Sequence, residues 1–119
     1  MPLRLGVSFD AGRNLAASVE RARLADHLGY GSLWASQLPP ARDTSLGLSA
    51  YAGATKRIGL GTAVLPIYTR HPTAMAQLAL TLDEISGGRF RLGIGVSHQV
   101  TVEGMWGLSI AHPVAAMRE

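Results

Sequence analysis

The sequence predicts an α/β fold in which short strands and helices alternate along the chain. Four apolar segments with the length and residue content of strands recur roughly every 25 to 30 residues, and a helical pattern follows each of the first three. The strand segments are continuously apolar, which is typical of parallel strands that are covered on both faces. Strands and helices in this rhythm form either an open, doubly wound sheet or a (β/α)8 barrel.

The first elements have clear boundaries. Residues 3–9 are predicted to form a short buried strand. Asn14 is placed to cap a helix over residues 15–28, and Gly29 can end that helix in the left-handed conformation. Residues 32–36 form the second strand.

Prolines and capping residues mark the later elements. After a loop with two prolines, Asp43 or Thr44 caps a helix over roughly residues 45–56. Pro72 stands where a first helical turn tolerates proline and opens the clearest helix of the chain, which the sequence SGGR ends. The remaining predicted elements are strands over residues 57–66 and 90–96 and a helix that starts at Pro113.

Periodicity leaves the choice between the open sheet and the barrel undecided. A phosphate-binding G-x-G-x-x-G after the first strand would favour the open sheet, but the sequence there is GVSFDAGRN. The segment GIGVSHQ contains only G-x-G, which is a weak signal.

Composition excludes several classes of function. The chain of 119 residues suits one domain, and it has no cysteine, so disulfides, thiolate metal sites and cysteine nucleophiles are ruled out. The net charge of +3 is spread along the chain without the basic stripe of a nucleic-acid binder. Four scattered histidines make a structural metal site unlikely on spacing. The sequence has no long apolar stretch for a signal or a membrane span, so we expect a cytoplasmic protein.

Four segments resemble a known family in order: LADHLGYGSLWASQ, RIGLGTAVLP, RHPTAMAQLALTLDEISGGRFRLGIGVS and SHQVTVEGMWGLS. Together they resemble the bacterial luciferase-like superfamily, and within it the oxidoreductases that use the deazaflavin coenzyme F-420. The resemblance implies a (β/α)8 barrel of the TIM type, with residues 1–119 forming the first four of its eight β/α units. It also implies a flavin or deazaflavin bound at the carboxyl ends of the strands.

Half a barrel would leave two parallel edge strands and an apolar face uncovered. We therefore expect either association of this chain into a homo-oligomer or a missing C-terminal half. The isolated chain is accordingly expected to be poorly stable or associated.

The resemblance places coenzyme-binding residues after the second and third strands. Gln37 follows the second strand, where the family often has a residue that contacts the coenzyme, although an amide cannot act as an acid or base. In the family, a bulge or a non-proline cis peptide in the third strand supports the ring. By position this falls at Thr62, Ala63 and Val64. An ordinary buried strand is the alternative.

Three polar residues, Ser97, His98 and Gln99, stand directly after the fourth strand. The resemblance implies that Ser97 contacts the coenzyme there. The imidazole of His98 could donate or accept the proton that accompanies hydride transfer, so His98 is the candidate catalytic residue. A solvated loop histidine is the alternative.

Several other residues have two interpretations. Arg70 and His71 are interpreted as a helix entry, and the same loop could line the mouth of the pocket. Trp34 is expected to pack in the core rather than to support a cofactor. Met105 and Trp106 are predicted to lie in a loop that could cover substrate or form an apolar surface.

Three functions follow from these expectations. The leading one is hydride transfer between F-420 and a small organic substrate, as part of a complete barrel. The first alternative is an FMN-dependent luciferase-like monooxygenase. The second is a catalytically silent fragment or interaction partner.

Overall fold

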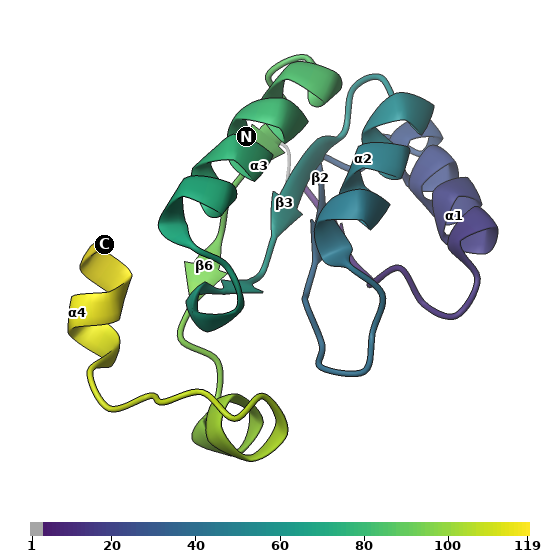
Figure 1. The fold of residues 1–119 in the computed structure, drawn as a ribbon. Coiled ribbons are helices and arrows are strands. Elements are labelled where there is room, and N and C mark those ends of the chain that lie inside the picture. The colour runs from purple at the N-terminus through teal and green to yellow at the C-terminus, as the bar shows by residue number, and fades with distance from the viewer. Residues whose placement is uncertain (1–3) are drawn as a thin grey trace.

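The computed structural model describes residues 4–119, and strands and helices alternate along them as predicted (Figure 1). The elements in chain order are β1 (Gly6–Ser8), α1 (Leu15–His27), β2 (Ser32–Ala35), α2 (Thr44–Ala54), β3 (Gly59–Thr62), β4 (Leu65–Pro66), a 3-10 turn η1 (Ile67–Thr69), α3 (Pro72–Ser86), β5 (Phe90–Arg91), β6 (Ile94–Gly95), a π-helical segment η2 (Val100–Met105) and α4 (Pro113–Arg118).

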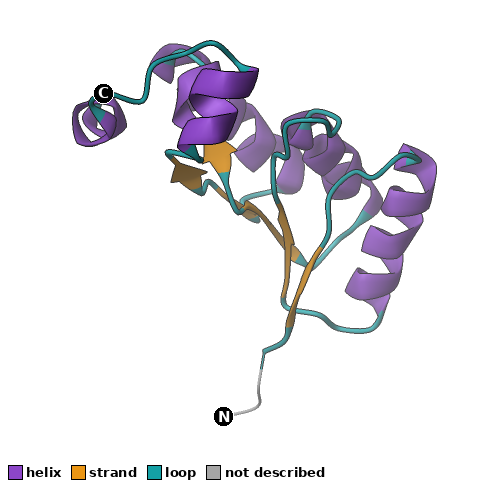
Figure 2. Cartoon of the chain, turned by 90° about the horizontal axis from the view of Figure 1, so that it is seen from below, coloured by secondary structure: helices purple, strands orange, loops and turns teal. Residues whose placement is uncertain are grey.

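The strands form a parallel sheet in the order β1-β2-β3-β5, and β4 pairs with β6 in a second parallel ladder. The predicted third strand is thus divided into β3 and β4, and the predicted fourth into β5 and β6. Helices α1, α2 and α3 all lie on the same side of the sheet (Figures 1 and 2). A doubly wound sheet has helices on both sides, so the barrel-type arrangement is the one that this chain adopts.

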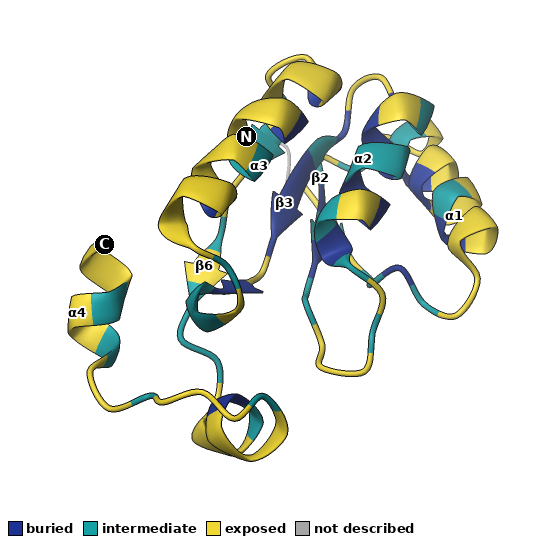
Figure 3. Cartoon of the chain, in the orientation of Figure 1, coloured by how far each residue is buried: buried dark blue, intermediate teal, exposed yellow. Residues whose placement is uncertain are grey.

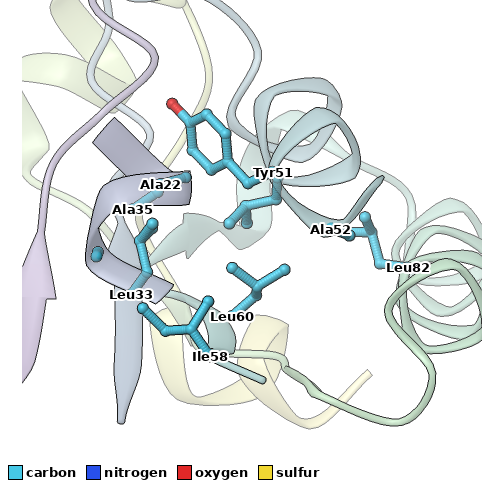
Figure 4. Packing of buried hydrophobic residues seen from close by; sticks show 10 residues of the cluster. Ala22, Leu33, Ala35, Tyr51, Ala52, Ile58, Leu60 and Leu82 are labelled. Atoms are coloured by element: carbon cyan, nitrogen blue, oxygen red, sulfur yellow. The ribbon is translucent and has the colours of Figure 1, made fainter. Parts of the chain in front are cut away.

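The core lies between the sheet and the three helices. Leu33 and Ala35 of β2 and Leu60 of β3 point toward the helices and are at most 2% exposed. From the helical side, Tyr51 of α2 is fully buried and meets the ring of Phe9 edge to face, with 5.7 Å between the ring centroids. Figure 4 shows Leu33, Leu60 and Tyr51 in this core. Figure 3 shows that buried residues gather on the sheet-facing sides of the helices.

The caps follow the sequence signals. The Asn14 side chain accepts a hydrogen bond from the N–H of Ala17, and Gly29 has φ +83° just beyond α1. At α2, where two caps were possible, Asp43 caps the helix and its carboxylate accepts from the N–H groups of Ser45 and Leu46. These local hydrogen bonds fix where each helix begins.

Two sequence predictions were wrong. The strand over residues 3–9 was expected to be buried, but β1 is an edge strand whose Gly6 and Ser8 are exposed. Residue 3 lies outside the described residues. Met105 and Trp106 were expected in a loop, but Met105 ends η2 and Trp106 caps it. The backbone forms a helix there because the fully buried Val102 anchors one side of the segment.

Asp26, near the end of α1, joins that helix to the start of β3. Its carboxylate accepts hydrogen bonds from the backbone N–H groups of Lys56, Arg57 and Ile58 at 2.8–3.0 Å. Partial burial raises the pKa of Asp26, but these three hydrogen bonds and the charge of Arg57 outweigh it and leave the pKa below 3.8.

Arg89 secures the neighbouring junction between α2 and the sheet. Its guanidinium donates to the carbonyl oxygens of Ala52, Thr55, Ile58 and Ser86 at distances of 2.6–3.2 Å. The carbonyl groups at the end of a helix lack intrahelical donors. The Arg89 guanidinium donates hydrogen bonds to those at the end of α2, where a positive charge is also favourable. Asp26 and Arg89 together hold the amino-terminal end of the strands.

No helix among residues 4–119 has both the length and the apolar character that crossing a membrane requires.

We predict that Asp26→Asn lowers the free energy of unfolding by about 1–2 kcal/mol at pH 7, because charged acceptors make the stronger hydrogen bonds. The pKa is lower in the folded state, so the carboxylate stabilises the fold above its unfolded pKa of about 3.9. This contribution is lost as the pH falls through that value toward the folded pKa.

Urea unfolding of both forms between pH 7 and pH 3 tests this. The difference between wild type and Asp26→Asn should shrink as the pH falls below about 4. Asp83→Asn, at an exposed carboxylate of α3, is the matched control and should change stability by less than about 0.5 kcal/mol. An Asp26→Asn effect no larger than that of the control would contradict the role given to Asp26.

Candidate functional site

The loops after three strands meet around one cavity of about 430 Å³. Gln37 and Leu38 reach it from β2, Arg70 from the loop after β4, and Trp106 from the end of η2. These loops lie at the carboxyl ends of the strands, at the lower end of the molecule in Figure 1. Barrel enzymes place their chemistry at this end. The cavity is therefore the candidate functional site.

Gln37 lines this cavity, but its amide is engaged by its own loop. Its Oε1 accepts from the N–H of Thr44 at 2.8 Å, and its Nε2 donates to the carbonyl oxygens of Leu38 and Arg42 at 3.2 Å. Both amide N–H groups thus have partners. In this structure the Gln37 side chain stabilises the loop before α2. Its contact with a coenzyme stays a prediction.

The end of β2 holds the segment between β3 and β4. The Ser36 hydroxyl donates to the carbonyl oxygen of Ala63 at 2.6 Å, and the N–H of Gln37 donates to that of Val64 at 3.3 Å. The peptide bond between Ala63 and Val64 is cis. The expected departure from regular strand geometry is therefore confirmed. The coenzyme contacts of Ala63 and Val64 stay predictions.

Thr62, the third residue predicted there, faces away from the cavity. It is 1% exposed, and its hydroxyl both donates to the carbonyl oxygen of Gly93 at 2.7 Å and accepts from the Gly93 N–H at 2.8 Å. A Cβ on Gly93 would lie 2.0 Å from the carbonyl oxygen of Thr62, so only glycine fits. This pair joins the third and fourth strands where the regular ladder is interrupted.

The residues after β6 turn directly into η2. Ser97 has φ 59°, a left-handed conformation that costs a residue other than glycine about 1–2 kcal/mol. The carbonyl oxygen of His98 accepts from the N–H groups of Thr101 and Val102, so His98 marks the start of the helical segment. Its imidazole is exposed and has no hydrogen-bonding partner among residues 4–119. Gln99 instead donates to Glu103, four residues further along η2.

Arg70 and Asp43 form an ion pair that closes one side of the cavity, with 2.6 Å between Nη2 and Oδ2. Burial raises the pKa of Asp43, but hydrogen bonds from Ser45 and Leu46 and the charge of Arg70 outweigh it and hold the pKa below 3.8. In the sequence, Asp43 was predicted only as a possible cap of α2, and Arg70 had two interpretations. Their separation of 27 residues gave no local signal for the pair.

The residues near β6 fit a flat ring. Ala63 and Val64 are exposed, and Val64 lies directly over Gly95, because a Cβ there would be 2.6 Å from Val64 Cγ2. A larger residue at position 95 would displace this apolar side chain. Ser97 follows two residues later and can offer a hydroxyl to the edge of such a ring. An apolar surface with nearby polar groups is what small-molecule sites generally present.

A larger hollow of about 590 Å³ lies elsewhere, between α3 and α4. Met75, Leu92 and Met117 make it mainly apolar, and Arg70 borders both this hollow and the candidate cavity. None of Gln37, Thr62, Ala63, Val64, Ser97 and His98 lines the hollow, so we place the candidate site at the cavity that Gln37 lines. Among residues 4–119, no cluster of three or more potential metal ligands is present.

Parallel strand–helix units with polar loops at the carboxyl ends define a part of a (β/α)8-type barrel. The family model described as luciferase-like monooxygenase matches residues 1–119. The chain belongs to this luciferase-like family, as the resemblance predicted.

Individual relatives and structures are similar to it. The chain is 38% identical over 119 residues to a Mycobacterium tuberculosis protein named "Putative coenzyme F-420-dependent oxidoreductase", and it covers 34% of that protein. It is 36% identical over 91 residues to the 4-hydroxyprotoasukamycin monooxygenase of Streptomyces nodosus subsp. asukaensis; the match covers 72% of this chain and 24% of the relative.

Among solved structures, the coenzyme F-420-dependent tetrahydromethanopterin reductase from Methanopyrus kandleri superposes with a TM-score of 0.82 at 27% identity. The match covers 92% of this chain and 31% of that one. The chain therefore spans about a third of the length of the proteins that it resembles.

We predict that Thr62→Val destabilises the fold by about 1–3 kcal/mol, because it leaves the Gly93 N–H without its partner. The Gly93 carbonyl keeps its second hydrogen bond, from the N–H of Leu65. Thr62→Ser keeps the hydroxyl and should recover most of the loss. Thermal unfolding of the three forms measures this. A Thr62→Val form as stable as the wild type would contradict the role given to the hydroxyl.

Proposed function

We propose that this chain is the coenzyme-facing part of an oxidoreductase that transfers a hydride between F-420 and a small organic substrate. The observation that carries the proposal is the 38% identity, over all 119 residues, to a protein whose name contains that coenzyme. The structural likeness to an F-420-dependent reductase supports the same choice. The exposed Val64 lies over Gly95, two residues before Ser97 in the chain, and this apolar surface suits the flat ring of such a coenzyme.

The coenzyme, when bound, supplies or accepts the hydride. The residues of this chain hold and orient it. Ala63 and Val64 offer the apolar surface, and Ser36 keeps this segment in place through its hydrogen bond to Ala63. The Ser97 hydroxyl is suited to the polar edge of the ring.

His98 is suited to move the proton that accompanies the reaction. It follows β6 immediately, at the end of the strands where the candidate cavity lies, and its imidazole is free of protein partners among residues 4–119. Imidazole exchanges protons near neutral pH, which the amide of Gln37 cannot do. The left-handed Ser97 next to it supports a functional role, since such backbone outliers gather at active sites.

The second candidate is an FMN-dependent monooxygenase on the same scaffold. The 36% identity to a monooxygenase favours it, although that match covers only 72% of this chain. A catalytically silent chain is the remaining candidate, because the chain covers only 34% of its F-420-named relative.

Titration of the chain with F-420 and with FMN, followed by the fluorescence of each, separates these functions. We predict tighter binding of F-420, by about tenfold or more, which corresponds to about 1.4 kcal/mol. Tighter binding of FMN would favour the monooxygenase. Binding of neither would contradict both enzymatic functions for this chain.

We further predict that His98→Ala slows turnover by about a hundredfold, the usual contribution of a positioned acid or base. Absorbance of the deazaflavin measures this in a polypeptide that contains the chain and turns over F-420. Stability should change by less than about 0.5 kcal/mol.

His27→Ala is the matched control, because His27 is also exposed but lies in the last turn of α1, at the opposite end of the strands. It should leave turnover unchanged. Unchanged turnover in His98→Ala would instead identify His98 as a solvated loop residue.

A further inference from the structure

The candidate cavity contains one opposite-charge pair, and that pair is held rigidly. Arg70 Nη2 lies 2.6 Å from Asp43 Oδ2, and the side chains are only 16% and 39% exposed, respectively. Asp43 is fixed from its other side, because its Oδ1 accepts hydrogen bonds from the Ser45 hydroxyl and from the N–H groups at the start of α2. The carboxylate therefore cannot swing away from Arg70 without uncapping the helix.

The pair brings no net charge to the cavity. The guanidinium of Arg70 is always protonated, and Asp43 is ionised at neutral pH because its pKa lies below 3.8. A ligand with a carboxylate would compete with Asp43 for the same cation and meet its negative charge at close range. Repulsion of this kind is how binding sites commonly reject a wrong charge.

Arg70 nevertheless keeps hydrogen-bond donors for a ligand. A guanidinium has five N–H donors, and among residues 4–119 only Asp43 accepts from this one. Gln37 offers no competing donor, since its two amide N–H groups bind Leu38 and Arg42. Arg70 is thus the charged donor that the lining of the cavity can turn toward a neutral acceptor, and the indole N–H of Trp106 is a second, uncharged one.

The rest of the wall is suited to a flat or apolar body. Leu38, Pro39, Ala41 and Trp106 line the cavity beside the pair. Aromatic rings pack well against an indole. The volume of about 430 Å³ is within the range of small-molecule sites.

We infer that this cavity selects uncharged, ring-containing molecules with a carbonyl acceptor, that Arg70 is the residue that recognises the carbonyl, and that Asp43 excludes carboxylates by cancelling the charge of Arg70. The inference rests on the proposed function only in taking this cavity as the substrate side of the site. The inference specifies that the substrate of this site is uncharged.

Benzamide and benzoate test the inference, because they have nearly the same shape and differ in charge. Each is titrated into the ¹⁵N-labelled chain, and the side-chain signals of Arg70 and Trp106 report binding at this cavity. The wild-type chain should bind benzamide at least threefold more tightly than benzoate. The Arg70→Gln variant should bind benzamide at least threefold more weakly than the wild-type chain does.

Asp43→Ser is the decisive variant. Serine is also a good helix cap, so α2 is retained while the negative charge is removed. The ratio of benzoate to benzamide affinity should rise at least tenfold. Asp43→Asn keeps the shape of the side chain and should raise the same affinity ratio. It provides the test if the serine variant does not fold.

Arg42→Gln is the matched control, since Arg42 is an exposed arginine of the same loop whose guanidinium donates to the Arg13 carbonyl instead. It should leave the ratio unchanged. Tighter benzoate binding by the wild-type chain, an unchanged ratio in both Asp43 variants, or binding of neither probe would overturn the inference. The F-420 titration described above fails or succeeds separately, so failure of the proposed function is recognised independently.

Discussion

The hydroxyl of Thr62 and the backbone of Gly93 form the contact on which the rest of the site depends. A regular ladder joins β3 to β5, and another joins β4 to β6, and between them the Thr62 hydroxyl binds the backbone of Gly93. The Gly93 carbonyl also accepts from the N–H of Leu65, at the start of β4. Because Gly93 has no Cβ, the backbones approach closely enough for the hydroxyl to serve both the N–H and the carbonyl. The strands can then change direction without leaving buried polar groups unpaired.

This change of direction decides which residues of the segment are exposed at the carboxyl ends of the strands. Thr62 stays on the helix side of the sheet, whereas Ala63 and Val64 are exposed. Ser36 and Gln37, at the end of β2, stabilise the redirected backbone through hydrogen bonds to the carbonyl oxygens of Ala63 and Val64. Two of the three residues predicted in this segment are thus accessible to a bound ring, and the third supports them from behind.

Many polar groups around the cavity form hydrogen bonds or ion pairs within the protein. Gln37 closes its loop and Asp43 both caps α2 and pairs with Arg70. Such internal pairing keeps the loops in fixed positions, and it also lowers the net charge that a ligand meets. Rigid loops and a balanced pair favour recognition by shape and by a few hydrogen bonds. This is the physical basis for expecting an uncharged substrate.

The sequence by itself determined the alternation of strands and helices, the caps at Asn14 and Gly29 and, through resemblance, the family. These features depend on local propensity and on hydrophobic spacing, which neighbouring residues carry. The resemblance also located the irregular segment at Ala63 and Val64, and the position directly after a strand singled out Ser97 and His98. The sequence could not assign Gln37 to its own loop, find the pair of Arg70 with Asp43, or place Trp106 beside them. The tertiary structure decided these, because each joins side chains from loops that are distant in sequence and meet only when the parallel strands bring their carboxyl ends together.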